Sequence, residues 1–280
     1  MTGSTAVVTG ASSGIGAAAA LELARRGMRV VAVGRDPERV AKLGAALREA
    51  GGAEQPEPLR ADFASQAEVR RLADELLERC PRIEVLVNNA GVVMKSREVT
   101  EDGRERTFAV NHLAPFLLTN LLLPRLRESA PARVITTSSD AHYRGQIRLD
   151  DLDGERRWSS WGAYCDSKLA NVLFTRALAA RENASEVVAH CLHPGVIRTR
   201  LFRGTRAPVR AGFAAASLFF DAPETGAETI VYLATDEEAG AMTGLYWSHS
   251  LAATPSERAL DDDLAEALWV RSAELTGTAG

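Results

Sequence analysis

Tyr164 and Lys168 are the two residues whose types and spacing most clearly suggest chemistry. They fall in a stretch with helical periodicity, Trp161–Arg181, and at four residues apart they share one helix face. A phenol has a pKa of about 10 in water, and a neighbouring ammonium group would lower that pKa toward neutrality. The pair could therefore exchange a proton with a bound molecule, although the same spacing also arises by chance in many helices.

A serine at the end of a predicted strand could assist this pair. Ser139 follows the apolar run Arg133–Ser138, and its hydroxyl could hydrogen-bond a substrate oxygen and stabilise it as charge develops. Tyrosine and lysine alone would be read as coincidence. The hypothesis that Tyr164 and Lys168 exchange a proton with a bound molecule is favoured because the serine and a glycine-rich loop lie upstream in the same chain.

The glycine-rich segment Thr9–Gly16 lies between a predicted strand, Ala6–Thr9, and a predicted helix, Ala17–Arg26. Its three glycines allow a tight turn and a close approach of the backbone to a pyrophosphate, which would sit at the positive end of the helix. A plain turn is the alternative, but the position between strand and amphipathic helix favours a nucleotide cradle. The residues predicted to contact a cofactor here are Gly10, Ser12, Ser13, Gly14, Ile15 and Gly16.

The end of the second predicted strand, Arg29–Val33, bears on which dinucleotide binds. An acidic residue there would accept hydrogen bonds from the adenosine ribose and repel an added phosphate. The chain instead has Gly34 and Arg35, with no carboxylate before Asp36. A guanidinium group suits a 2′-phosphate, so we predict NADP(H) rather than NAD(H), against the alternative that Arg35 is a solvated loop residue.

Polar residues also end the next two predicted strands. Asp62 could accept a hydrogen bond from the adenine amino group, or it could cap the following helix. The run Asn88–Gly91 could line the adenosine side, or it could form an ordinary turn. The residues predicted to bind a cofactor in this region are Asp62, Phe63, Asn89, Ala90 and Gly91.

Seven apolar runs carry these motifs and alternate with helical segments along the chain. This alternation predicts a single α/β domain over residues 1–280, of the doubly wound Rossmann type, with a seven-stranded parallel sheet and helices on both faces. Helix signals agree with it: Asp36 precedes Pro37, Ser65 precedes Glu68 by three residues, and Gly27 follows the first helix. The expected strands are Ala6–Thr9, Arg29–Val33, Pro58–Ala61, Val85–Asn88, Arg133–Ser138, Val187–Leu192 and Gly244–Trp247.

Two stretches interrupt the alternation. Arg144–Trp161 is polar and contains tryptophan, and Phe202–Asp221, within a segment that starts at about Arg200, is irregular and then apolar. Long irregular segments in a compact domain are usually functional. We expect the second to be a substrate lid, with a buried helix or a partner surface as alternatives, while Trp158 and Trp161 either border the substrate entrance or anchor the inserted loop. The last segment, Ser256–Leu275, is typical of a capped amphipathic helix.

The composition excludes several classes of function. With 33 basic and 37 acidic residues and a net charge of −4, the chain has no basic stripe that would suggest binding to nucleic acid or anionic membrane. Three scattered cysteines fit a reducing compartment, the histidines lack metal-ligand spacing, and no run is long enough to span a membrane. We therefore expect a cytoplasmic protein without a metal site.

The combined motifs resemble those of the short-chain dehydrogenase/reductases through Trp247. The resemblance covers Thr9–Gly16, Asn88–Gly91 and the pair Pro194–Gly195. Several segments are closer to a retinol-dehydrogenase-like branch, for example Ser138–His142, Leu149–Leu152 and Ser167–Phe174. The resemblance implies a catalytic tetrad of Asn111, Ser139, Tyr164 and Lys168, and further cofactor contacts at Tyr164, Lys168, Pro194, Gly195, Ile197 and Thr199.

The resemblance also implies a mechanism. NADPH would deliver hydride to a carbonyl carbon while Tyr164 protonates the oxygen and Ser139 orients it. Lys168 would bind the nicotinamide ribose and lower the tyrosine pKa, and Asn111 would hold a water that relays protons. The expected partner is therefore a small carbonyl or alcohol substrate, whose identity the sequence does not reveal.

Two other functions compete with this reading. A dinucleotide-binding sensor or scaffold would keep the fold but normally loses the tyrosine or lysine, both of which are present. A sugar-nucleotide epimerase or dehydratase usually has a larger C-terminal domain than the residues after Gly195 provide. By resemblance, a homodimer or homotetramer could form through the helices that hold Asn111 and Tyr164.

Overall fold

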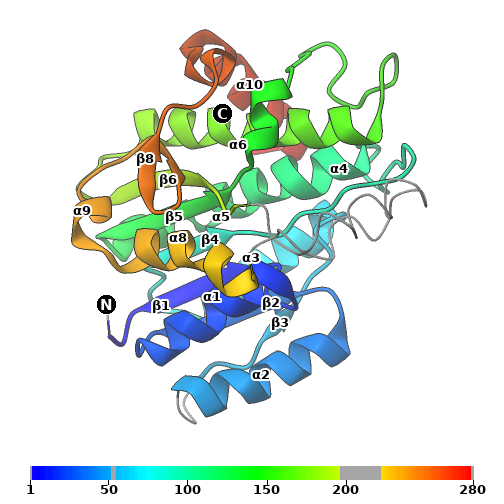
Figure 1. The fold of residues 1–280 in the computed structure, drawn as a ribbon. Coiled ribbons are helices and arrows are strands. Elements are labelled where there is room, and N and C mark those ends of the chain that lie inside the picture. Colours follow the sequence, from blue (N-terminus) through cyan, green and yellow to red (C-terminus); the bar gives the residue numbers. More distant parts are fainter. Residues whose placement is uncertain (1, 52–54, 196–221, 279–280) are drawn as a thin grey trace.

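An eight-stranded sheet forms the centre of the molecule, with helices on both faces (Figure 1). The computed structural model describes residues 2–51, 55–195 and 222–278. The predicted Rossmann-type architecture is confirmed. Across the sheet the strands are β3 (Leu59–Arg60), β2 (Arg29–Gly34), β1 (Thr5–Thr9), β4 (Val85–Asn88), β5 (Ala132–Thr137), β6 (Val187–His193), β7 (Leu245–Ser248) and β8 (Leu251–Ala253).

The eighth strand is a difference from the predicted sheet of seven parallel strands. β1 to β7 are parallel, whereas β8 pairs antiparallel with β7. The reason is a two-residue hairpin turn at His249 and Ser250, which both adopt positive φ values of 51° and 58°. Such turns normally carry glycine or asparagine, so this sequence gives little warning of a hairpin. The Ser250 amide also donates to Thr229 Oγ1 at 3.0 Å, which fixes the turn against the neighbouring helix.

Two apolar cores separate the sheet from its helices. One lies under α1 (Gly14–Arg25), α2 (Pro37–Gly51) and α8 (Pro223–Thr235). The other lies under α3 (Gln66–Arg79), α5 (Ala114–Glu128) and α6 (Ser160–Arg181). The shorter helices in the described residues are α4 (Arg106–Phe108), a π-helical turn (Ala109–Leu113), two 3₁₀-helices (Asp140–Arg144 and Glu257–Leu260) and α9 (Glu237–Gly240).

Three helix boundaries follow the predicted capping residues. Asp36 Oδ1 accepts hydrogen bonds from the amides of Glu38 and Arg39 at the start of α2, and Ser65 Oγ accepts from the Glu68 amide at the start of α3. Gly27, just beyond α1, has a φ of +81°, which a residue with a side chain adopts only at a cost. These local signals fix where the chain enters and leaves each layer.

The C-terminal helix α10 (Asp262–Thr276) lies across α5 and α6 (Figure 1). Its Trp269 is 5% exposed and inserts between two phenylalanines, with ring centroids 4.9 Å from Phe116 and 5.8 Å from Phe174. The guanidinium carbon of Arg181 lies 4.2 Å from the centroid of the same indole. The predicted C-terminal helix thus completes the second core, but it begins at Asp262 rather than at Ser256, because a short 3₁₀-helix precedes it and Asp261 caps it.

Truncating Trp269 to alanine should lower the free energy of unfolding by about 3–5 kcal/mol, because a large buried ring leaves a cavity between α10, α5 and α6. Equilibrium urea unfolding followed by circular dichroism measures this change. Val270→Ala is the matched control, since Val270 is adjacent on the same helix but 45% exposed. Equal losses for the two variants would contradict the packing role of Trp269.

Candidate active site

A cleft of about 1140 Å³ opens at the carboxyl ends of the parallel strands. In sheets of this type a crevice forms where the strand order reverses, and here β1 and β4 are neighbours at that point. The volume is large enough for a dinucleotide and a small substrate. Predicted residues that line the cleft are Gly10, Ser12, Ser13, Gly14, Ile15, Arg35, Asp62, Phe63, Asn89, Ala90, Gly91, Ser139, Tyr164, Lys168, Pro194 and Gly195.

The glycine-rich loop leaves the start of α1 open to the cleft. Gly10 and Gly14 have φ values of +65° and +61°, and Ser13, at the N-cap, makes no side-chain hydrogen bond to the first turn. The backbone N–H groups of this turn are therefore available to an anion. Gly16 lies behind the cleft, where an added Cβ would come within 2.6 Å of Gly10 O. This close backbone packing fits a dinucleotide's pyrophosphate.

Thr9 and Asn89 tie the ends of β1 and β4 together beside this loop. Thr9 Oγ1 donates to Val87 O at 3.1 Å and accepts from the amides of Asn89 and Ala90. The Asn89 amide group donates back to Thr9 O at 3.0 Å. The neighbouring Asn88 instead reaches α5, where its Nδ2 donates to Thr119 Oγ1 at 2.9 Å. Of the two predicted amides, only Asn89 therefore lines the cleft.

The end of the cleft beside β2 and β3 carries two guanidinium groups. Arg35 is mostly exposed and lies 3.9 Å from a carboxylate oxygen of Asp62. Arg39, in the first turn of α2, also lines the cleft and was not identified from the sequence. The carboxylate of Asp36 is occupied by capping α2 and by an ion pair with Arg39 at 3.2 Å. Arginine, rather than an uncommitted carboxylate, therefore dominates the site where a ribose phosphate would lie.

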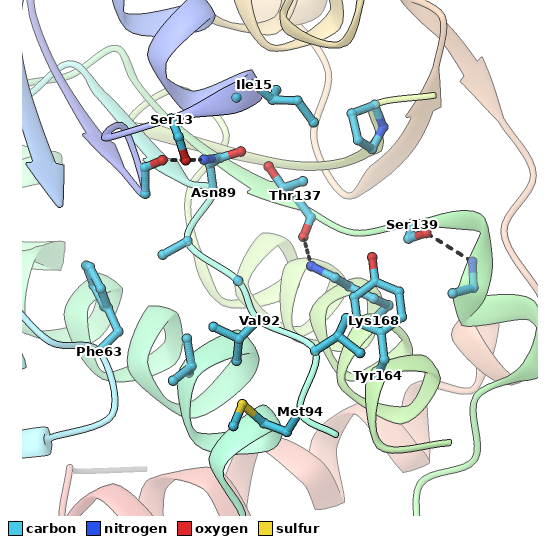
Figure 2. A pocket seen from close by; sticks show the side chains of 18 of the residues that line it. Ser13, Ile15, Phe63, Asn89, Val92, Met94, Thr137, Ser139, Tyr164 and Lys168 are labelled. Carbon is cyan, nitrogen blue, oxygen red and sulfur yellow. Dashed lines mark hydrogen bonds between the residues drawn. The ribbon is translucent and has the colours of Figure 1, made fainter. Parts of the chain in front are cut away.

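Tyr164 and Lys168 face the same part of the cleft from α6 (Figure 2). Both side chains are buried, and the Lys168 ammonium nitrogen lies 5.5 Å from the centroid of the Tyr164 ring. The ammonium group donates to the Thr137 carbonyl at 2.9 Å. Within the described part of the chain, this is the single hydrogen bond that the Lys168 ammonium group makes. An ammonium group has three N–H donors, so two of them remain for a ligand in the cleft.

Burial dominates the acid–base properties of this pair. It raises the pKa of Tyr164 to about 12, although a hydrogen bond with Ser139 opposes the shift. Burial also lowers the pKa of Lys168 to about 8. The lowering of the tyrosine pKa that was expected from Lys168 is therefore not seen, because burial of the Tyr164 phenol raises it. At neutral pH Tyr164 keeps its proton, as a proton donor must.

Ser139 is the N-cap of the first 3₁₀-helix and is separated from the end of β5 by Ser138. Its Oγ accepts a hydrogen bond from the Ala141 amide at 3.2 Å, which orients the hydroxyl at the edge of the cleft (Figure 2). Its carbonyl oxygen accepts from Nδ1 of the buried His142 at 2.8 Å, and His142 Nε2 accepts from the Ser256 amide at 3.0 Å. The C-terminal segment therefore holds the serine turn in place through the ring of His142.

Asn111 lies in the π-helical turn behind the cleft and is fully buried. Its Oδ1 accepts from the Val92 amide at 2.8 Å, and its Nδ2 donates to Val92 O and to Ser167 Oγ, both at 3.0 Å. A Cβ placed on Gly91 would lie 3.5 Å from Asn111 Oδ1 and 3.7 Å from Lys168 Nζ. Asn111 thus fixes the backbone after β4 next to Lys168. π-Helical turns such as the one that holds Asn111 are frequent at functional sites.

The described structure places the two predicted loop tryptophans differently. Trp158 anchors the inserted loop, since its indole Nε1 donates to Glu105 Oε1 at 3.1 Å. Trp161 lines the cleft, with its ring centroid 5.7 Å from that of Tyr164. The predicted cofactor contacts Ile197 and Thr199 and the predicted lid over residues 200–221 lie outside the described residues.

Several lining residues were not found by sequence reasoning. They include Thr137 at the end of β5, the segment Val92–Met94 after β4, and Asp140 and His193 beside Ser139. Thr137 could have been found by applying the strand-end argument to β5, whereas the others have no signal in the local sequence. Within residues 2–51, 55–195 and 222–278, no group of three or more potential ligands could hold a metal ion, and no helix is long and apolar enough to cross a membrane.

The fold and the cleft define a dinucleotide-binding protein of the Rossmann class. Residues 4–209 match the family model described as short chain dehydrogenase. The chain belongs to this family, as the sequence motifs predicted. Members are oxidoreductases that act on alcohol or carbonyl groups of small molecules with a nicotinamide dinucleotide, and the chain is an oxidoreductase of this class.

Curated relatives place the chain near the retinol-dehydrogenase-like branch. It is 42% identical over 284 residues to human "Retinol dehydrogenase 13", covering 98% of this chain and 85% of the relative. It is 45% identical over 277 residues to a "Putative daunorubicin C-13 ketoreductase DnrU" of Streptomyces sp. (strain C5), covering 98% of this chain and 93% of that protein.

Solved structures have the same fold. A putative uncharacterized protein from Mycobacterium Paratuberculosis is 34% identical, with a TM-score of 0.76, and the match covers 99% of this chain and 94% of that one. A "Pseudomonas aeruginosa RhlG/NADP active-site complex" is 30% identical, with a TM-score of 0.69, covering 89% of this chain and 95% of that one.

Proposed function

We propose that the chain is an NADP(H)-dependent oxidoreductase that interconverts a ketone or aldehyde and an alcohol, with Tyr164 as the acid/base. The observation that carries the proposal is the arrangement of one cleft. The open start of α1 lies at its nucleotide end, and the buried Tyr164 and Lys168 lie with Ser139 at its other end. A cofactor bound along this cleft would supply or accept the hydride.

Each residue of the proposed tetrad has a role that its contacts support. Tyr164 donates its phenolic proton to the substrate oxygen, and a raised pKa keeps that proton in place until it is needed. Ser139 orients the same oxygen with a hydroxyl fixed by the Ala141 amide. Lys168 uses its remaining N–H donors toward the ribose of the cofactor, and Asn111 holds the backbone at Val92 that closes this side of the site.

A panel of aldehydes, ketones and secondary alcohols, run with both NADPH and NADH, tests the activity. We expect NADPH-dependent reduction of several carbonyl compounds, in keeping with relatives named as a retinol dehydrogenase and a ketoreductase. Tight NADPH binding without turnover of any compound would favour the alternative of a dinucleotide-binding sensor.

Replacing Arg35 with alanine should weaken NADPH binding by about 10- to 100-fold, because a hydrogen-bonded charge pair contributes roughly 1.5–3 kcal/mol. NADH has no 2′-phosphate, so its dissociation constant should change little. Fluorescence titration of both cofactors measures the difference. The NADP complex of the 30% identical Pseudomonas protein supports this preference.

Arg48→Ala provides the matched control for Arg35. Arg48 lies on α2, has a side chain that is 38% exposed against 62% for Arg35, and pairs with Glu57 away from the cleft. It should leave both affinities unchanged. An equal loss of NADPH and NADH affinity in Arg35→Ala would refute the phosphate assignment, and Arg39 would then be the residue to replace next.

We further propose that the chain is one domain, because its described residues share a single sheet. We also propose that it is located in the cytoplasm, because its amino-acid composition is ordinary. A homo-oligomer that forms through α5 and α6 would also involve α10, which covers part of both helices. Light scattering of the purified protein tests the oligomeric state.

A further inference from the structure

Asp140 is a cleft residue that the proposed tetrad does not use. It directly follows Ser139, and its side chain is 57% exposed. An exposed aspartate usually samples several rotamers, but this carboxylate is held by two side chains from other strands. Tyr246 OH, from β7, donates to Asp140 Oδ1 at 2.8 Å, and His193 Nε2, from β6, lies 3.4 Å from Asp140 Oδ2.

The backbone of Asp140 determines which nitrogen of His193 carries the proton. The Asp140 amide donates to His193 Nδ1 at 3.3 Å, so the neutral ring carries its proton on Nε2, which faces the Asp140 carboxylate. Burial and the neighbouring His142 and His249 lower the pKa of His193, while Asp140 opposes them. The imidazole ring of His193 therefore contacts both the backbone amide and the carboxylate of Asp140.

The restraint leaves hydrogen-bonding capacity directed at the cleft. A carboxylate has about four acceptor sites, and Tyr246 and His193 take two of them from the sheet side. The remaining capacity is fixed next to the serine proposed to orient the substrate carbonyl. An acceptor held in advance by its surroundings binds a donor without the cost of ordering its own side chain.

Charges around the cleft indicate the kind of donor. Apart from the groups near β2 and β3, the charged residues that line the cleft are the cations Lys95, Arg106, Arg144 and Lys168 and the anions Glu98 and Asp140, with Arg106 paired to Glu98 at 3.4 Å. Because cations outnumber anions in this lining, their repulsion offsets part of the attraction between Asp140 and an ammonium group, whereas a neutral hydroxyl meets no such repulsion. A hydroxyl near the reacting carbonyl therefore fits this wall best.

We propose that Asp140 is a specificity-determining residue that selects carbonyl substrates carrying a hydroxyl group close to the reacting carbonyl. This inference rests on the proposed carbonyl-reducing function. Ser139 positions the carbonyl oxygen, and the adjacent Asp140 accepts a hydrogen bond from the neighbouring hydroxyl. Tyr246 and His193 are positioning residues that act through the carboxylate.

The test compares 2-hydroxyacetophenone with its methyl ether, 2-methoxyacetophenone, as substrates for NADPH-dependent reduction. The quantity of interest is the ratio of the two kcat/KM values, which is independent of the fraction of folded enzyme. In the unmodified protein the hydroxy ketone should be preferred by about 10-fold or more, as expected for a hydrogen bond to a charged group. Asp140→Ala should reduce the ratio by the same factor.

Two further variants keep the test decisive. Tyr246→Phe retains the carboxylate but removes one restraint, so the ratio should fall by less than in Asp140→Ala. Asp150→Ala removes an exposed aspartate that does not line the cleft, and it should leave the ratio unchanged.

The outcomes separate this inference from the function on which it rests. Absence of reduction of any carbonyl compound by the unmodified protein would overturn the proposed function and this inference with it. Reduction of both ketones with no preference, or with a ratio that Asp140→Ala does not alter, would overturn the role of Asp140 alone.

Discussion

Replacing Tyr164 with phenylalanine should lower kcat/KM for NADPH-dependent ketone reduction by about 10²–10⁴-fold, the usual contribution of a positioned general acid. The substitution removes the phenolic oxygen but keeps a ring of nearly the same shape in a buried site, so the fold should survive. The dissociation constant of NADPH should change little, because the proposed cofactor contacts of Lys168 and the glycine-rich loop remain. Steady-state kinetics and fluorescence titration measure the two effects.

Tyr232→Phe is the control for this substitution. Tyr232 lies on α8, its ring packs 5.7 Å from that of Trp247, and it does not line the cleft. It should reduce ketones at the unmodified rate. Unchanged turnover in Tyr164→Phe would exclude Tyr164 as the proton donor, whereas a loss of NADPH affinity equal to the loss of turnover would assign it a binding role instead.

The second large effect is expected at Gly16. In Gly16→Ala the new Cβ would stand 2.3 Å from Asn89 Nδ2 and 2.6 Å from Gly10 O, so either the loop or the link between β1 and β4 must move. A misplacement of about 1 Å in an active site can lower the reaction rate on the order of 10²-fold. We expect NADPH affinity to fall by that order, and the free energy of unfolding to fall by about 1–3 kcal/mol from overpacking.

Ala18→Gly separates cofactor binding from helix stability. Ala18 lies on α1 two residues beyond Gly16 and does not line the cleft. The glycine should weaken the helix by roughly 0.8–1 kcal/mol without entering the cradle, and NADPH affinity should be retained. Isothermal titration with NADPH and urea unfolding distinguish the two effects. Equal NADPH affinities for Gly16→Ala and the unmodified protein would contradict the proposed cradle.

The sequence alone predicted most of the fold, because its signals are local. Gly27 needs a positive φ, and Asp36 and Ser65 cap helices through neighbouring amides. Strand β8 could not be predicted in the same way. Its hairpin turn at His249 and Ser250 lacks the glycine or asparagine that normally marks such turns, and contact with α8 helps to fix it.

The sequence predicted those residues of the candidate site that belong to ordered motifs or follow the ends of predicted strands. The spacing of Tyr164 and Lys168 correctly placed them on one helix face, but burial, which depends on the whole fold, sets their pKa values. The environment of Asp140 depends on β5, β6 and β7 ending side by side. No local pattern in the sequence indicates that Tyr246 lies next to Asp140.

The two outermost strands of the sheet have a consequence for self-association. A long free strand edge offers unpaired backbone groups to another chain, and short edge strands limit such additions. Here β3 has two residues and β8 has three, while the longer inner strands are paired on both sides. The hairpin at His249 and Ser250 thus covers the edge of β7. Unpairing β8, for example by proline substitution at Ala252, should therefore make the protein more prone to edge-to-edge aggregation.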